Sequence, residues 1–204
     1  MKGLLGKKIG MINFFDGRGN AIAATVVEAG PCPVVQIKTM EENGYHAVQL
    51  GYLERKVKNT NKPLLGHYGK VKTAPQRILK EFRDFEGDVK LGDQVRVDIF
   101  HEGERVKITG LSKGRGFAGV VKRHKFSGGP KTHGQSDRHR APGSIGSSSF
   151  PKRVFKGLRM AGRMGHKRIT IRNLEILKVI PDRNYLLVKG GVPGARNTIL
   201  EIRK

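Results

Sequence analysis

The sequence contains few residues of several types, and each shortage excludes a class of protein. Cys32 is the only cysteine among 204 residues, so neither an intramolecular disulfide nor a thiolate cage around a metal can form. A lone thiol fits a reducing, cytoplasmic setting. The N-terminal stretch MKGLLGKKIGMINFF has lysines between short apolar runs, so it lacks the continuous apolar region of a signal peptide. No apolar run approaches the length of a membrane span.

Acidic residues are also scarce. The chain has 40 Lys and Arg against 17 Asp and Glu, a net charge of +23, and a pI near 10.6. Such an excess opposes compaction of the chain and favours a polyanionic partner, of which nucleic acid is the leading candidate. An anionic membrane is the alternative, but Gly and Pro break the basic stretch too often for an amphipathic helix. We therefore expect no membrane partner.

The positive charge is concentrated in residues 111–168, which we call the arm. This segment carries fifteen Lys and Arg and one acidic residue, Asp137, so that it holds +14 of the total charge. A solvated surface normally mixes both signs, and this segment does not. Its glycines, with Pro130, Pro142 and Pro151, predict that it forms no helix. Its like charges predict that it becomes ordered only against a polyanion.

The residues on either side of the arm alternate between apolar and polar, which is typical of β-strands with one buried face. The resulting fold class is mainly β, with a single small barrel or sandwich formed by residues 1–110 and 169–204, from which the arm projects. A short helix is expected from Pro63 to about Lys70. The predicted strands are Lys7–Phe15, Ala21–Ala29, Val34–Thr39, Tyr45–Leu53, Gln76–Phe82, Gln94–Phe100, Arg105–Thr109, Ile169–Arg172, Leu174–Ile180, Tyr185–Lys189 and Ile199–Ile202.

Cations recur every few residues along the arm, which suits a chain that follows successive phosphates of an RNA. Seventeen basic residues of the arm are therefore predicted to bind RNA, which the family resemblance given below identifies as rRNA. They are Lys113, Arg115, Lys122, Arg123, Lys125, Lys131, His133, Arg138, His139, Arg140, Lys152, Arg153, Lys156, Arg159, Arg163, Lys167 and Arg168.

Four aromatic residues lie between these cations: Phe117, Phe126, Phe150 and Phe155. They could stack on unpaired bases, each contact contributing roughly 1–3 kcal/mol. They could instead fold back as apolar anchors, because valines such as Val120 and Val154 are close in sequence. Anchoring is the favoured interpretation.

Two glycine motifs resemble nucleotide-binding loops. Residues Gly114 to Gly119 satisfy the G-x-G-x-x-G pattern. A dinucleotide fold also needs a helix that opens at the third glycine and an acidic residue after the next strand, and the sequence predicts neither. Gly157 and Gly162 lack the Lys-Ser/Thr pair of a phosphate-binding loop. No nucleotide, other cofactor or small-molecule substrate is therefore expected.

His133, Asp137 and His139 form the one cluster that suggests an RNA-acting enzyme with a metal or a general base. Neighbours such as Arg138 and Arg140 would repel a divalent metal, whereas His beside Arg suits contacts with phosphate and the ribose 2′-hydroxyl. The arm holds no second carboxylate for a two-metal site. Catalytic and metal-binding residues are therefore predicted to be absent, with the enzyme kept as the alternative.

Several long motifs extend this interpretation: GLLGKKIGM, GYHAVQLGY, SKGRGFAGVVKRHKF, THGQSDRHRAPGSIG, VFKGLRMAGRMG and LLVKGGVPG. With them the chain resembles, from end to end, the bacterial large-subunit ribosomal proteins numbered three in the universal set. The resemblance implies a six-stranded translation-protein barrel with a small helical or irregular insertion near residues 56–80. It also implies a structural protein of the cytoplasmic ribosome that binds large-subunit rRNA near its 3′ end and helps to nucleate subunit assembly.

The same resemblance implies that the arm extends toward the peptidyl-transferase centre without catalysing the reaction there. It further implies that the ribosomal proteins numbered fourteen and nineteen are neighbours. One departure concerns a glutamine that some members methylate just after the Gly-Ser-Ile-Gly run. Ser147 stands at that position, so this modification is not expected.

Overall fold

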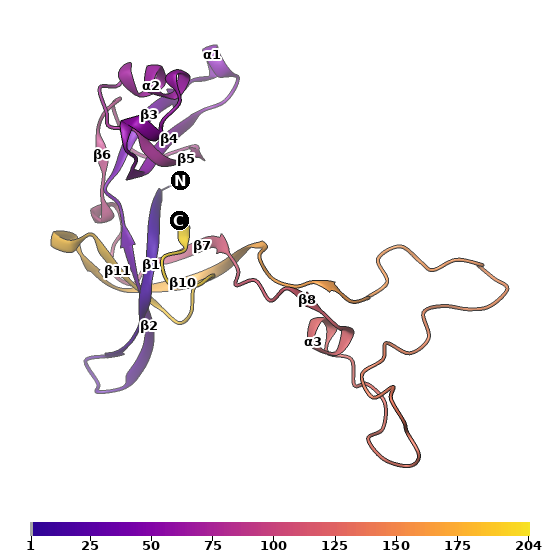
Figure 1. Cartoon of the computed structure of the whole chain (residues 1–204). Coiled ribbons are helices and arrows are strands. Elements are labelled where there is room, and N and C mark those ends of the chain that lie inside the picture. Colours follow the sequence, from indigo (N-terminus) through magenta and orange to yellow (C-terminus); the bar gives the residue numbers. More distant parts are fainter. Residues whose placement is uncertain (1) are drawn as a thin grey trace. The chain divides into compact units, whose positions relative to one another are not determined.

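The chain forms two compact units, which a computed structural model describes over residues 2–204. One unit comprises the residues up to Ser112 together with Arg168–Lys204, and the other is Lys113–Lys167. Strands are the main regular structure of the first unit, while the second is mostly irregular chain (Figure 1).

Six antiparallel strands of the first unit close into a barrel. Around the barrel the order is β1-β12-β7-β10-β11-β2. The strands are β1 (Gly3–Phe15), β2 (Ala21–Ala29), β7 (Arg105–Leu111), β10 (Arg168–Ile180), β11 (Tyr185–Lys189) and β12 (Ile199–Arg203). Closure satisfies every strand edge within the barrel, which removes the exposed edges of an open sheet. The predicted closed antiparallel barrel is confirmed.

The residues between β2 and β7 form a second sheet in the same unit, of order β5-β4-β3-β6. Its strands are β3 (Cys32–Lys38), β4 (Ala47–Glu54), β5 (Gln76–Arg83) and β6 (Gln94–Val95). These strands were predicted, but as part of the barrel and not as a separate sheet. Short helices connect the strands of this unit: α1 (Met40–Asn43), η1 (Val57–Asn59), α2 (Lys62–Gly69), η2 (Val97–Ile99) and η3 (Pro181–Arg183). The helix expected from Pro63 is α2, with Pro63 in its first turn.

Two local predictions were wrong. The strand predicted for Gln94–Phe100 ends at Val95, and η2 follows it. Val95 pairs with Cys32, the first residue of β3, so the partner strand ends there and residues 96–100 have no backbone to pair with. Between β3 and β4 the single helical turn α1 ends at Gly44, which takes a positive φ of 75°. The two strands predicted on either side of Asn173 are one strand, β10, with a bulge there.

The barrel and the second sheet share one hydrophobic core. Phe82 of β5 is fully buried in the same cluster as Leu4 of β1 and Ile202 of β12. Gly3 shows how close this packing is, because a Cβ at that position would overlap the Phe82 ring. The second sheet is thus fixed on the barrel by side-chain packing. No helix within residues 2–204 is both long and apolar enough to cross a membrane.

Candidate nucleic-acid interface

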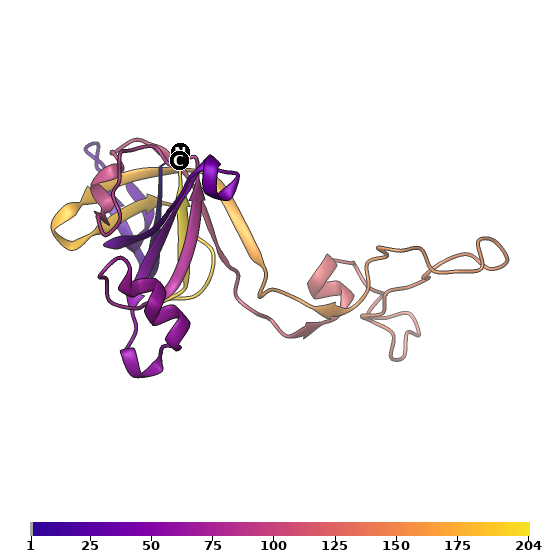
Figure 2. The same ribbon diagram turned by 90° about the horizontal axis from the view of Figure 1, so that it is seen from above.

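The arm begins with a paired neck formed by residues 113–124 and 160–166. Strands β8 (Phe117–Ala118) and β9 (Gly162–Arg163) pair antiparallel. Two backbone hydrogen bonds, from Arg115 N to Met164 O (2.9 Å) and from Met164 N to Gly116 O (2.8 Å), continue the pairing. In both overall views the outgoing and returning segments run side by side here (Figures 1 and 2). The neck therefore has regular, paired structure.

A short helix, α3 (Val120–His124), follows β8. The prediction that the arm contains no helix was wrong, because the prolines all lie beyond this stretch and Val120 is buried. Arg123 Nη1 donates to the Met160 carbonyl oxygen at 2.6 Å, and His124 Nε2 lies 3.1 Å from the same oxygen. Two basic side chains thus tie α3 to the returning segment.

Beyond α3, residues 128–140 form a closed loop around His139. Gly129 N donates to His139 O at 2.9 Å. The two ring nitrogens of His139 lie 2.9 Å from Pro130 O and 3.0 Å from Ser136 O. Both ring nitrogens of His139 thus face backbone carbonyl oxygens of the loop. His139 consequently holds this loop together.

Most of the predicted rRNA-binding side chains are exposed. Arg123 and His139, which have the internal roles described above, are half-buried. Among residues 2–204, no cation from Lys113 to Arg163 forms an ion pair within the chain. The exposed residues of the predicted set are Lys113, Arg115, Lys122, Lys125, Lys131, His133, Arg138, Arg140, Lys152, Arg153, Lys156, Arg159, Arg163, Lys167 and Arg168.

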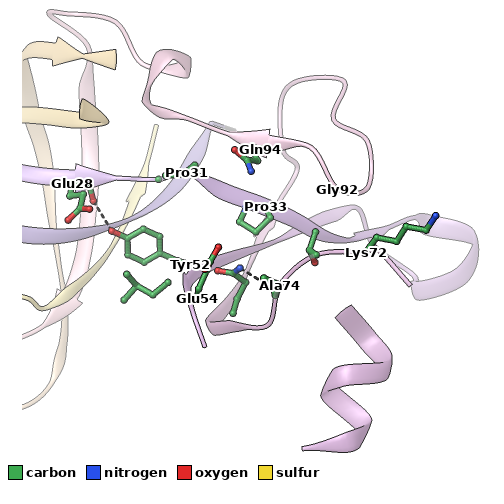
Figure 3. Close-up of a pocket in the computed structure, with 13 residues that line it drawn as sticks. Glu28, Pro31, Pro33, Tyr52, Glu54, Lys72, Ala74, Gly92 and Gln94 are labelled. Atoms are coloured by element: carbon green, nitrogen blue, oxygen red, sulfur yellow. Dashed lines mark hydrogen bonds between the residues drawn. The ribbon is translucent and has the colours of Figure 1, made fainter. Parts of the chain in front are cut away.

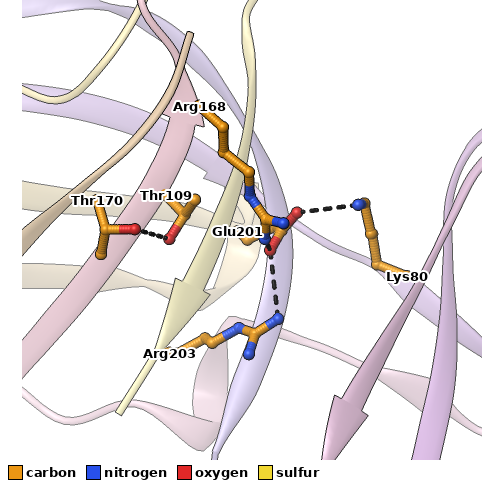
Figure 4. A network of polar contacts seen from close by, with 6 residues as sticks. All are labelled: Lys80, Thr109, Arg168, Thr170, Glu201 and Arg203. Atoms are coloured by element: carbon orange, nitrogen blue, oxygen red, sulfur yellow. Dashed lines mark hydrogen bonds and ion pairs between the residues drawn. The ribbon is translucent and has the colours of Figure 1, made fainter. Parts of the chain in front are cut away.

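Arg168 differs from the other cations because it belongs to the barrel strand β10. Its guanidinium donates to Glu201, whose carboxylate also pairs with Arg203 at 3.3 Å and with Lys80 at 3.4 Å (Figure 4). Glu201 is 7% exposed, so three cations compensate one nearly buried charge. Glu201 was not predicted because no sequence motif marks it, and the network engages Arg168 within the first unit.

Three of the four arm phenylalanines are not packed as anchors. Phe117 is 81%, Phe150 86% and Phe155 61% exposed. Phe126 is half-buried, with its ring centroid 6.1 Å from that of His124. The favoured interpretation as apolar anchors was therefore wrong for the first three, because the valines near them in sequence do not enclose them. Exposed rings beside unpaired cations are a surface suited to unstacked bases.

The glycine motif does open a helix, contrary to prediction, since Gly119 is the N-cap of α3. The remaining features of a dinucleotide site are different. The preceding strand has two residues and pairs antiparallel with β9, whereas the dinucleotide fold has a parallel β-α-β unit. The helix is one turn long and is followed by Lys125 in the left-handed conformation.

A groove of about 440 Å³ lies between the start of β3, β4 and the segment after α2 (Figure 3). Glu28, Glu54 and Lys72 are its charged lining residues. Tyr52 donates from its hydroxyl to Glu28 O at 3.1 Å, and burial raises the pKa of this phenol. The nearby Cys32 thiol is buried, and burial raises its pKa to about 12, so it is not a nucleophile. No three His, Cys, Asp or Glu residues in the described part of the chain are grouped to hold a metal ion.

A small antiparallel barrel that carries a long extension with exposed cations and aromatic rings is typical of proteins that bind a polyanion along an extended surface. Comparison with known proteins identifies a family within this class. The chain belongs to the ribosomal protein L3 family, whose profile matches residues 84–183. The resemblance inferred from the motifs is thereby confirmed.

Three curated relatives cover nearly the whole chain. Each is called large ribosomal subunit protein uL3, and each match spans 99% of this chain and 98% of the relative. The protein of Chloroherpeton thalassium is 54% identical over 204 residues. Those of Chlorobium limicola and Salinibacter ruber are 52% and 54% identical.

Proposed function

We propose that this protein is a structural constituent of the large subunit of the cytoplasmic ribosome and binds large-subunit rRNA directly through its arm. The proposed binding residues are the seventeen predicted above, acting near the 3′ end of the rRNA. Residues 1–110 and 169–204 form the domain that carries the arm. Family membership supports the ribosomal role, since the relatives are named as large-subunit proteins.

One observation carries the rRNA interface: the cations from Lys113 to Arg163 are mostly exposed and form no ion pair within residues 2–204. An uncompensated row of like charges repels itself, and binding to phosphates with release of counterions removes that repulsion. The exposed Phe150 and Phe155 add rings that can stack on bases.

The proposal includes a role in nucleating subunit assembly and an arm that extends toward the peptidyl-transferase centre. It also includes contacts with the ribosomal proteins numbered fourteen and nineteen. The protein acts there by binding and not as an enzyme. In support, both ring nitrogens of His139 face backbone carbonyls, so this histidine of the suspected catalytic cluster is committed to loop structure.

The test uses a transcript of the 3′ domain of large-subunit rRNA and the full chain. Arg115, Lys122 and Lys125 are changed together to Ala, because their side chains are exposed and make no polar contact within residues 2–204. We expect the log–log salt dependence of binding to flatten by roughly 0.7–0.9 per lost phosphate contact, hence by about 2–3 in total.

A control variant changes Lys7, Lys189 and Lys204 to Ala. Each of these lysines already pairs with a carboxylate, Glu28, Glu175 or Glu104 respectively. The control loses the same formal charge as the arm variant. A difference in salt slope between the two variants therefore reports lost phosphate contacts and not the lower net charge. An unchanged salt slope in the arm variant would refute the proposed interface.

A further inference from the structure

The chain between β4 and β5 is a second basic segment, and unlike the arm it contains no acidic residue. No Asp or Glu occurs from Arg55 to Lys80, whereas eight Lys and Arg do. We call residues 55–75 the β4–β5 loop. Its six cations, and Arg77 just after it, are all exposed: Arg55, Lys56, Lys58, Lys62, Lys70, Lys72 and Arg77.

The β4–β5 loop has an internal scaffold that holds these cations in place. Arg55 N donates to Pro75 O at 2.7 Å, directly beyond the β4–β5 pair Glu54 and Gln76, so the two ends of the loop meet. Between them η1 and α2 give the loop helical structure. The cations are therefore presented by a folded surface and not by a flexible tail.

Two side chains of α2 fix the loop on the sheet beneath it. Tyr68 is 2% exposed, and its hydroxyl donates to Gln76 O at 3.1 Å. His67 Nε2 lies 3.1 Å from Gln49 Oε1 of β4. A polar group buried in this way stabilises one arrangement of the loop, because leaving it unpaired would cost about 1–3 kcal/mol.

Several other cations of the first unit have a carboxylate partner, and these seven do not. Lys38 pairs with Glu81 at 2.7 Å at the far end of β5, and Lys80 pairs with Glu201. Across the described residues, neither the six cations of the loop nor Arg77 has a carboxylate within ion-pair distance. The loop is thus a separate patch of unneutralised positive charge.

We propose that the β4–β5 loop is a second RNA-binding surface, which contacts the phosphate backbone independently of the arm. This inference rests on the proposed function. The ligand is the backbone and not the bases, because the aromatic ring of the loop, Tyr68, is buried and cannot stack. Only Val57 and Leu64 are exposed large apolar residues of the loop, too few to insert into a bilayer.

The experiment measures binding of the same rRNA transcript to three full-length triple variants. The loop variant changes Lys56, Lys58 and Lys62 to Ala, and the arm and control variants are those described above. All three loop lysines are exposed and contact no carboxylate, so thermal unfolding should match that of the unchanged protein. We expect the loop variant to flatten the salt slope by about 2, beyond any change in the control.

Lysine acetylation of the unchanged protein, with and without the transcript, gives a second measurement. RNA should protect Lys58 and Lys62, while Lys189, paired with Glu175, should react equally in both states. If the arm variant loses slope while the loop variant retains it and Lys58 stays reactive, the loop proposal is wrong and the proposed function stands. If the unchanged protein itself shows no salt-dependent binding, both are wrong.

Discussion

The guanidinium of Arg123 donates to the carbonyl oxygen of Met160 across the two segments of the neck, at 2.6 Å. Because one partner is charged, such a bond is stronger than one between neutral groups. It gives Arg123 an internal role that its neighbours Lys122 and Lys125 do not have. The arm thus contains cations that hold its own structure and cations that face outward.

Changing Arg123 to Ala should loosen the neck without unfolding the barrel. Loss of one charge-assisted bond at a half-buried site should lower local stability by about 1 kcal/mol, which speeds hydrogen exchange of the Arg115 and Met164 amides about fivefold. Lys122→Ala is the matched control, since its side chain makes no such bond. Equal exchange in the two variants would show that the bond does not hold the neck.

Protease should cut the free protein first within residues 127–158, between the paired neck segments, where the chain is irregular and exposed. Added rRNA transcript should slow that cleavage while leaving the rate in the barrel unchanged. First cuts within β8 or α3 would contradict the folded neck. Cleavage unaffected by rRNA would count against contact between this stretch and RNA.

Changing Phe150 and Phe155 to Ala should weaken RNA binding by roughly 1–3 kcal/mol per stacked base and leave the unfolding temperature of the free protein unchanged. The reason is that both rings are largely exposed, so the fold gains little from them. A matched control is Phe82→Ala, which removes a fully buried ring and should cost about 3–5 kcal/mol of stability. A fall in stability without loss of affinity would restore the anchoring interpretation.

Glu201→Gln should destabilise the barrel by about 1–2 kcal/mol, because three cations lose the one carboxylate that compensates them. The value lies below that of a fully buried pair, since Lys80 and Arg168 are partly exposed and screened by solvent. Glu175→Gln is the control: its pair with Lys189 is exposed on both sides, and its loss should change stability by less than about 0.5 kcal/mol. Equal effects in denaturant unfolding would argue against the network.

The cluster of Lys38, Tyr45 and Glu81 should make the free energy of unfolding depend on pH in the acidic range. The hydrogen bond from Lys38 is the largest cause that lowers the pKa of Glu81 below its ordinary 4.5, and the Tyr45 hydroxyl, 2.9 Å from the carboxylate, adds to it. With the folded pKa below the unfolded value, the folded protein binds fewer protons. The stabilisation is therefore present above pH 4.5 and is lost as the pH falls through the folded pKa.

Glu81→Gln consequently should lower the free energy of unfolding at pH 7 and have a smaller effect near pH 3. Tyr45→Phe should show a smaller version of the same difference, because it removes one of the two donors to Glu81. A Glu81→Gln effect of the same size at both values would show that the ionised carboxylate does not contribute.

Much of the fold was predictable from sequence because alternation is a local property. The strands at Ala21–Ala29 and Tyr185–Lys189 were predicted with their observed bounds. Pairing between distant strands was not, since the closure of β12 between β1 and β7 depends on packing that no local pattern records. The same limit explains why the strands between β2 and β7 were not recognised as a second sheet.

The positive charge of the candidate site could be predicted from the sequence, but the contacts and exposure of its side chains could not. The arm cations stand out in the sequence, yet nothing there distinguishes Arg123 or Arg168, which have internal partners, from Lys122, which has none. The exposure of Phe150 could not be predicted either, because sequence neighbours such as Val154 need not be neighbours in space. The sequence shows that no Asp or Glu occurs from Arg55 to Lys80. It does not show that residues of this stretch fold into a helical loop that presents the cations together.

The most direct test of the central claim is sedimentation of the protein with large ribosomal subunits through a moderate salt wash. We expect the intact chain to stay with the subunit, and the variant with Arg115, Lys122 and Lys125 changed to Ala to dissociate at lower salt than the control with Lys7, Lys189 and Lys204 changed. Release of the intact chain into the supernatant at moderate salt would contradict a structural role in the large subunit.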